Sequence, residues 1–149
     1  NQLQRTRIIK KITDYFGENL EDLRIAVWGL AFKANTNDIR ESPSHYLIKE
    51  LKSKGASIIA FDPEAIETTK QELGTSIEYA EDQYAALERA DALVIATEWN
   101  EFRRPDFKKM KKLMNNPLIF DGRNLYEPNI ISQYGFDYFS VGRPQILRK

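Results

Sequence analysis

Short apolar runs alternate with amphipathic stretches along the whole chain, and this alternation predicts repeated strand and helix units. The first 20 or so residues place apolar side chains three or four positions apart, which is typical of one helical face, and this face ends at Gly17. The next apolar run, LRIAVWGL at 23–30, is nearly continuous, as expected for a strand buried on both faces of a parallel sheet. The chain is therefore predicted to begin with a helix and a buried strand.

The segment ESPSHYLIKELKSKG predicts a helix with defined ends. Ser42 stands at the N-cap position, Pro43 at the first helical position, and Gly55 after the last apolar residue of the face. We expect this helix to pack against one face of the sheet.

The same alternation continues to the end of the chain. Further strands are expected at 56–63, 76–80, 91–99, 117–123 and 137–143, and further helices at 64–74, 82–90, 104–114 and 128–135. The segment at 76–80 fits a loop equally well. Six strands with intervening helices predict an α/β fold: a Rossmann-like, doubly wound, mostly parallel six-stranded sheet with helices on both faces.

Composition limits the kinds of site that this chain can hold. Its 149 residues fit one domain, and 22 basic residues balance 22 acidic ones, so no overall field attracts nucleic acid or an anionic membrane. The chain has no cysteine and a single histidine, His45, which excludes a thiolate nucleophile and a multi-histidine metal site within it. His45 has no titratable partner in view and fits a structural or exposed residue. No run reaches the ~18 apolar residues of a membrane span, and the basic start lacks the apolar core of a signal peptide, so we expect a cytoplasmic protein.

The loop after the first strand is the first candidate site, because ligands of open parallel sheets bind beyond the carboxyl ends of the strands. Gly29 is followed by Phe32 and Lys33 where the dinucleotide fingerprint needs glycines, so a pyrophosphate is not expected there in the usual way. Lys33 offers a point charge for a phosphate, Phe32 a flat face or a backbone contact for a base, and Arg40 a bidentate fork. Equally, Lys33 and Arg40 fit solvated loop charges, with Phe32 covering the core.

Asp62 follows the second strand and has two interpretations. A carboxylate at this place holds a ribose hydroxyl in NAD-binding domains. The dipeptide Asp62-Pro63 also fits an ordinary exit from a strand into a turn, in which the aspartate bonds its own backbone.

Two later strand ends offer charged side chains. We expect the guanidinium of Arg123 to lie near the first loop, where it would complete an anion site, although a surface ion pair with Asp121 of little energetic worth fits as well. The stretch TEWNEFRR offers Glu98 and Arg103. Its two aromatic residues, Trp99 and Phe102, are three apart and fit mutual packing.

Several of these stretches occur in a familiar order. GLAFKANTNDIRESPS, FDP, TEWNEF, FDGRNLY and VGRP resemble the C-terminal UDP-binding domain of the UDP-glucose/GDP-mannose dehydrogenase family, whose members oxidise C6 of a nucleotide sugar. The resemblance spans about residues 1–144. Family members also carry an N-terminal NAD domain and a central helical dimerisation region. The resemblance therefore implies a fragment, with residues 1–20 as the tail of the central connecting region and 21–149 as the C-terminal UDP-sugar-binding domain.

The resemblance also implies roles for four residues. Positions matching Phe32 and Lys33 contact the nucleotide sugar, and the position matching Arg123 contacts its UDP part. The position matching Arg40 reaches the NAD pyrophosphate from across the domain cleft. In the family, two successive hydrides pass from the C6 alcohol to NAD, and a cysteine of an upstream motif traps the aldehyde.

The implied ligand is UDP or UDP-glucose, and NAD is the implied cofactor of the full-length enzyme, bound mainly by the N-terminal domain. A homodimer or higher oligomer is implied through the central region, with no nucleic-acid or membrane partner, and this chain alone is expected to be inactive. The stretch TEW resembles the UDP-glucose branch, whereas relatives acting on N-acetylated sugars more often have histidine or another residue there. Two alternatives stay open: a dehydrogenase for another nucleotide sugar, such as a UDP-N-acetylhexosamine, and a free-standing nucleotide-binding or regulatory module.

Overall fold

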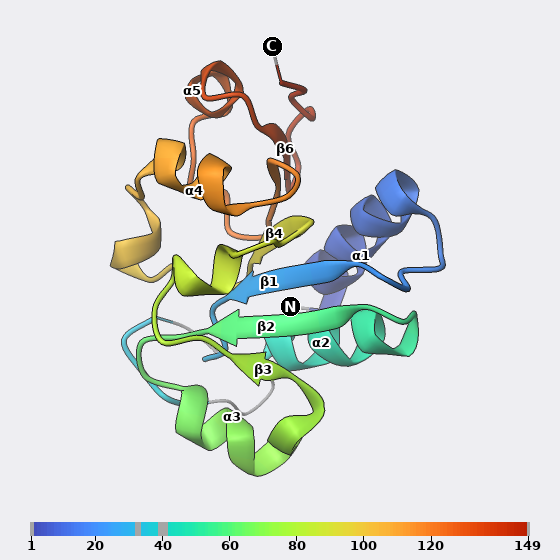
Figure 1. The fold of residues 1–149 in the computed structure, drawn as a ribbon, viewed down its shortest axis with the longest axis vertical. Helices are drawn as coiled ribbons and strands as arrows, with labels where there is room; N and C mark the ends of the chain where they lie inside the picture. Colours follow the sequence, from blue (N-terminus) through green and yellow to red (C-terminus); the bar gives the residue numbers. More distant parts are fainter. Residues whose placement is uncertain (1, 32–33, 39–41, 149) are drawn as a thin grey trace.

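A six-stranded sheet forms the centre of the computed structural model, which describes residues 2–31, 34–38 and 42–148 (Figure 1). Its strands are β1 (Arg24–Trp28), β2 (Ser57–Phe61), β3 (Glu78–Tyr79), β4 (Ala92–Ile95), β5 (Leu118–Asp121) and β6 (Asp137–Ser140). Their order across the sheet is β3-β2-β1-β4-β5-β6, and each neighbouring pair is parallel. This order reverses direction between β1 and β4, which is the switch point of a doubly wound sheet. The predicted Rossmann-like α/β fold is confirmed.

Helices cover both faces of the sheet. The α-helices are α1 (Gln2–Phe16), α2 (Pro43–Ser53), α3 (Ile66–Leu73), α4 (Phe107–Leu113) and α5 (Pro128–Gln133), and the 3-10 helices are η1 (Gly74–Ser76), η2 (Ala85–Leu87) and η3 (Asn100–Phe102). Figure 1 shows α1 and α2 together on one side of the sheet and α4 and α5 apart from them. Apolar residues of α1 and α2 share one buried cluster, while those of α4 and α5 belong to a second cluster.

Strand β1 shows why its sequence is apolar throughout. Ile25 and Val27 point into the cluster beneath α1 and α2, whereas Ala26 and Trp28 point into the cluster beneath α4 and α5. Trp28 is fully buried and stacks on Phe102, with 5.0 Å between the ring centroids. Burial on both faces requires apolar side chains at successive positions, which explains the continuous run.

Helix α1 packs onto the sheet rather than standing apart from it. Ile8 and Ile12 are buried in the same cluster as the apolar face of α2, and Leu20 is fully buried just beyond the helix. The side chain of Ile8 lies close to Gly122, at the end of β5. The first half of α1 therefore lies near the carboxyl edge of the sheet.

The predicted helix at 82–90 is wrong, because only the three residues of η2 are helical there. The backbone carbonyl of Gln83 accepts a hydrogen bond from the indole of Trp28 at 2.9 Å. Arg89 adopts a left-handed φ of 58°, and its N–H donates to the carbonyl of Leu113. Partners elsewhere in the fold thus take up backbone groups that a continuous helix would pair internally. Among the described residues, no helix is both long and apolar enough to cross a membrane.

Candidate functional site

The ends of β1, β4 and β5 lie against one another at the carboxyl edge of the sheet. Gly29, which follows β1, has a φ of +106°, and a Cβ on it would stand 2.5 Å from Oγ1 of Thr97, which follows β4. Only glycine is compatible with this conformation and this approach. Gly122, which follows β5, donates its N–H to the carbonyl of Ile95 at 2.9 Å. The stretches beginning at Gly29, Thr97 and Gly122 are therefore spatial neighbours.

Asp62 is the buried acceptor of the turn that follows β2. Its side chain is almost completely buried, and Oδ1 accepts hydrogen bonds from the backbone N–H groups of Glu64 and Ala65, both at 2.8 Å. The interpretation of Asp62 as a strand-to-turn exit is thus supported by the hydrogen bonds that its carboxylate makes.

The second oxygen of Asp62 serves the loop after β1 and the segment after β4. Oδ2 accepts from the backbone N–H of Leu30 at 2.7 Å and of Ala31 at 3.0 Å, and from the indole Nε1 of Trp99 at 3.1 Å. With five N–H donors, the carboxylate has no capacity left for a ribose hydroxyl. Together with the lack of a second and third glycine after Gly29, this shows that the edge does not fit a dinucleotide in the usual Rossmann manner.

The carbonyls of the same two loop residues are held by hydroxyl groups. Thr97 donates to the carbonyl of Ala31 at 3.0 Å, and Ser42 and Ser44 donate to the carbonyl of Leu30 at 2.8 and 3.2 Å. Ser42 occupies the N-cap position of α2 as predicted, but its hydroxyl makes no cap hydrogen bond to the helix. Its donation to Leu30 instead ties the start of α2 to the end of the β1 strand. All four backbone polar groups of Leu30 and Ala31 are therefore paired with side chains from other segments.

Phe32, Lys33 and Arg40 lie outside the described residues, so their predicted roles stay predictions. The anchored residues Leu30 and Ala31 come directly before Phe32 in the chain. An open cavity of about 580 Å³ adjoins the described part of this loop, and its lining consists of Asn35, Thr36, Asn37, Glu64 and Trp99. The volume is in the range of small-molecule sites, and most of the lining groups are polar.

Arg123 forms an ion pair with a different carboxylate from the one considered in the sequence. Its Nε lies 2.5 Å from Oε2 of Glu98, and the two side chains are 37% and 26% exposed. The surface pair between Asp121 and Arg123 is wrong, because Asp121 is fully buried and accepts from the backbone N–H of Arg123, the N–H of Leu125 and the hydroxyl of Tyr138. The Glu98–Arg123 pair therefore joins the TEW and FDGR stretches across two neighbouring strand ends.

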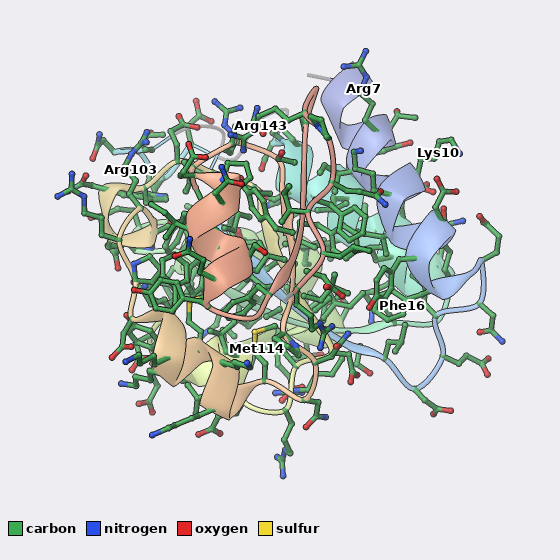
Figure 2. The ribbon with its side chains drawn as sticks, turned by 90° about the horizontal axis from the view of Figure 1, so that it is seen from above. Arg7, Lys10, Phe16, Arg103, Met114 and Arg143 are labelled. Carbon is green, nitrogen blue, oxygen red and sulfur yellow. The ribbon has the colours of Figure 1, made fainter. Side chains whose placement is uncertain are left out.

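The Glu98–Arg123 pair leaves most of the guanidinium available. The contact to Glu98 uses the single Nε–H, while the two Nη nitrogens carry four further N–H groups. A bound anion would meet these donors beside an ionised carboxylate, so Glu98 lowers the attraction of Arg123 for an anion. Arg103, a cation of the TEWNEFRR stretch, is exposed at the periphery of the molecule in Figure 2.

Tyr138 completes the buried network beneath Arg123. Its hydroxyl lies 2.6 Å from Oδ2 of Asp121. Burial and the neighbouring charge of Asp121 raise the pKa of Tyr138 far above its usual value, so the phenol stays protonated and acts as a donor. The turn that presents Arg123 is therefore fixed by neutral and charged hydrogen bonds that do not involve its guanidinium.

His45 is a structural residue, as one of the two interpretations of the sequence expected. It is 5% exposed, its Nδ1 lies 2.6 Å from Oε2 of Glu72, and its Nε2 lies 3.1 Å from Oγ1 of Thr69. Burial raises the pKa of Glu72, but the hydrogen bond and charge of His45 and the nearby Lys49 outweigh it and lower that pKa overall. Glu72 is the titratable partner that sequence reasoning missed, because it lies on another helix.

The two aromatic residues of the TEWNEF stretch, Trp99 and Phe102, make their main ring and hydrogen-bond contacts with other residues. Trp99 and Phe102 belong to the same buried cluster, but the ring of Phe102 stacks on Trp28 and meets Phe61 edge-on at 6.4 Å. Trp99 instead uses its indole N–H to bind Asp62. The tryptophan therefore links two strand ends, which is a role that its spacing from Phe102 did not indicate.

Comparisons with known proteins agree with the motifs found at this edge. A family model described as the UDP-glucose/GDP-mannose dehydrogenase family, UDP binding domain, matches residues 26–128. A UDP-glucose 6-dehydrogenase of Rhizobium meliloti is 40% identical over 144 residues, which cover 97% of this chain and 33% of the relative. The UDP-glucose 6-dehydrogenase TuaD of Bacillus subtilis is 40% identical over 146 residues, covering 98% of this chain and 32% of the relative.

Solved structures show the same fold. A UDP-glucose dehydrogenase from Pyrobaculum islandicum matches with a TM-score of 0.73 at 30% identity, over 84% of this chain and 27% of that protein. An NDP-N-acetyl-D-galactosaminuronic acid dehydrogenase from Methanosarcina mazei matches with a TM-score of 0.77 at 25% identity, over 93% of this chain and 28% of that protein. The chain spans about a third of the length of the relatives that it matches. It belongs to the UDP-glucose/GDP-mannose dehydrogenase family, of which it is the UDP-binding domain.

Proposed function

We propose that this domain binds the UDP part of UDP-glucose within an NAD-dependent UDP-glucose 6-dehydrogenase. The observation that carries the proposal is the adjacency of the GLA, TEW and FDGR stretches on three neighbouring strand ends, with Arg123 at their edge. The relatives at 34–40% identity are named UDP-glucose 6-dehydrogenases, which favours UDP-glucose as the substrate of the whole protein.

In this proposal, Lys33 and Arg123 are the charge partners of the diphosphate, and Phe32 contacts the nucleotide sugar. These roles come from the match to the family motifs. Support from the fold is indirect: Leu30 and Ala31 are anchored immediately before Phe32, and Asp121 anchors the turn of Arg123. A site fixed in this way loses little conformational entropy when the ligand binds.

The reaction itself belongs to the whole protein. NAD supplies the hydride acceptor when it is bound, and the residues of this chain's sheet edge do not fit its usual site, so we assign it mainly to an N-terminal domain. Arg40 is proposed to reach its pyrophosphate from across the cleft. The cysteine nucleophile would come from an upstream segment, residues 1–20 from the connecting region, and the dimer or higher oligomer from that region as well. The cytoplasmic location remains a prediction.

A second substrate class has one observation in its favour. The Methanosarcina mazei protein, which has the higher TM-score of the two compared above, is named an NDP-N-acetyl-D-galactosaminuronic acid dehydrogenase. At 25% identity it is more distant than the UDP-glucose relatives, and the family model that matches this chain is described as a UDP binding domain. UDP-glucose is therefore preferred, and UDP-N-acetylhexosamine is the alternative.

A comparison of ligand affinities tests the proposal. Isothermal calorimetry of the 149-residue chain should show UDP binding with a dissociation constant on the order of 0.1 to 1 mM, because two charge-assisted contacts are offset by ordering costs. GDP and ADP should bind more weakly, uridine weakest, and NAD not measurably. Equal affinity for all diphosphates would contradict a UDP site and favour a general nucleotide-binding module.

A further inference from the structure

A second open cavity, of about 500 Å³, lies between α1 and the loop that follows β6. Its main lining residues are Arg7, Lys10, Lys11 and Asp14 from α1, with Gly142 and Arg143 from the loop. Figure 2 shows Arg7 and Arg143 on the same side of the molecule, with Lys10 further along α1. Arg143 belongs to the VGRP stretch, for which the UDP site leaves no role.

The cavity concentrates positive charge in a chain whose charges balance overall. Lys10 pairs with Asp14 at 3.2 Å, so these two charges offset each other. Within residues 2–31, 34–38 and 42–148, the structure shows no carboxylate partner for Arg7, Lys11 or Arg143. Three uncompensated cations around one hollow favour an anionic occupant.

The guanidinium of Arg143 is held in place by neutral acceptors. Its Nε donates to Oγ of Ser140 at 3.0 Å, its Nη1 to the carbonyl of Tyr126 at 3.3 Å, and its Nη2 to the hydroxyl of Tyr138 at 2.9 Å. One N–H remains on each Nη nitrogen. An arginine that is already oriented, keeps its full charge and has two donors left is suited to an oxyanion, because little side-chain freedom is lost on binding.

The backbone beside Arg143 is also fixed. The side-chain amide of Asn124 donates to the carbonyl of Val141 and accepts from its N–H, both at 2.9 Å. The buried carboxylate of Asp121 lies behind the hydroxyl of Tyr138 and already accepts three hydrogen bonds. Its negative charge reduces the field of Arg143 without occupying the guanidinium. The loop therefore forms a hydrogen-bonded wall of the cavity, with the cationic side chains of α1 as the other wall.

We propose that this cavity binds a phosphoryl or pyrophosphoryl group, with Arg143 as the oriented donor and Arg7 and Lys11 as surrounding charge. Arg123, which pairs with Glu98, is not among the residues that line this cavity. The ligand of the cavity is either a free phosphate-type anion or the diphosphate of a nucleotide. The proposal goes beyond UDP binding at the strand ends and does not depend on it.

The test is an NMR titration of the isotope-labelled chain with inorganic pyrophosphate, and separately with UDP, at constant ionic strength set with chloride. Pyrophosphate should shift the amides of Gly142, Arg143 and residues 7–11 in a saturable manner, with a dissociation constant on the order of 1 mM. Arg143→Gln should weaken this response about tenfold, and Arg143→Lys should weaken it less, because lysine keeps the charge but loses the fork. Lys108→Gln, at an exposed lysine on α4, removes the same charge elsewhere and should leave the response unchanged.

Two further variants keep the test decisive. If Arg143→Gln fails to fold, the double variant Arg7→Gln and Lys11→Gln should give the weakened response, because both side chains lie on α1 outside its buried face. Arg123→Gln should leave the pyrophosphate response intact, which separates this site from the UDP site. Shifts by UDP that depend on Arg143 would identify a nucleotide source, and shifts by pyrophosphate alone a free anion. No saturable shift with either ligand, or an unchanged response in Arg143→Gln, would overturn the proposal.

Discussion

Two buried aspartates lie at the same carboxyl edge of the sheet, on strands that β1 and β4 separate, and they organise that edge in different ways. Asp62 follows β2 and Asp121 ends β5, and both are almost completely buried. Asp121 accepts from two N–H groups of its own turn and from Tyr138 on the adjacent strand. Asp62 accepts from two N–H groups of its own turn and from three donors on the ends of β1 and β4. Asp62 thus joins the ends of three strands, whereas Asp121 fixes its own turn and ties it to the neighbouring strand β6.

The difference separates two ways of preparing a binding site. Two of the three hydrogen bonds to Asp121 come from its own turn and the third from the adjacent strand, so the geometry of the Arg123 turn depends little on β1 and β2. The loop beginning at Leu30 is held by Asp62 and Thr97, which lie 32 and 66 residues away from their partners in the sequence. A change at Asp62 is therefore expected to affect the loop that carries Phe32 and Lys33 without touching either residue.

The largest effect is expected for Asp62→Asn. An amide can replace only one carboxylate oxygen at a time, so at least two of the five buried N–H donors lose their acceptor. We expect the free energy of unfolding to fall by about 3 to 4 kcal/mol. Urea denaturation measures this, and UDP affinity measured well below the transition should fall as well. A loss under about 1 kcal/mol would show that the five hydrogen bonds of the Asp62 carboxylate, the Asp62 hub, contribute little to stability.

Asp121→Asn should cost less, because the amide can orient so that only the N–H of Arg123 loses its acceptor. The expected loss is about 2 to 3 kcal/mol. The exposed Asp14→Asn on α1 is the control and should change stability by no more than about 0.5 kcal/mol. If Asp121→Asn proved more destabilising than Asp62→Asn, the larger structural role assigned to Asp62 would be contradicted.

Trp99→Phe isolates one arm of the Asp62 hub. Phenylalanine keeps an aromatic ring but loses the N–H that binds Asp62, so we expect a loss of about 1 to 2 kcal/mol. The double variant with Asp62→Asn should cost less than the sum of the two single variants, since the residues share one hydrogen bond. Strict additivity in a denaturation cycle would argue that Trp99 acts only by packing.

The sequence predicted the sheet and most helices because strands buried on both faces and amphipathic helices leave patterns within a single segment. The wrong helix at 82–90 shows the limit of this information. Its alanine and leucine content favours a helix. The indole of Trp28, however, donates a hydrogen bond to the carbonyl of Gln83, and the backbone of Arg89 adopts a left-handed conformation. Both events depend on residues far away in the chain.

The candidate site shows the same limit more strongly. The motif order led to the right family, and the carboxyl ends of the strands were the right place to look. The partners of Trp99 and Arg123, and those of Asp62 beyond its own turn, were not readable from the sequence, because the parallel pairing of strands brings them together rather than sequence spacing. His45 is similar: Glu72 comes 27 residues later and only helix packing brings the two together.

A smaller effect on stability is expected from the ion pair between Asp137 and Arg148. Asp137 begins β6, and the hydrogen bond and charge of Arg148 lower its pKa despite partial burial. A lowered pKa in the folded state contributes stability above the unfolded value of about 3.9, and this contribution is lost as the pH falls through the folded value. Arg148→Gln should therefore destabilise the chain near neutral pH and flatten the fall of the melting temperature below about pH 4. An unchanged acid profile would contradict the pairing.

The central claim is that Arg123, fixed by its turn and partly neutralised by Glu98, receives the diphosphate of UDP. An NMR titration of the wild-type chain with UDP, compared with Arg123→Gln and Glu98→Gln, tests it most directly. We expect saturable shifts at Gly29–Ala31 and Asp121–Asn124 in the wild type, about tenfold weaker binding in Arg123→Gln, and tighter binding by about two- to threefold in Glu98→Gln, because that change removes a competing carboxylate. UDP affinity that is the same in all three proteins, or shifts confined to other parts of the chain, would contradict the claim.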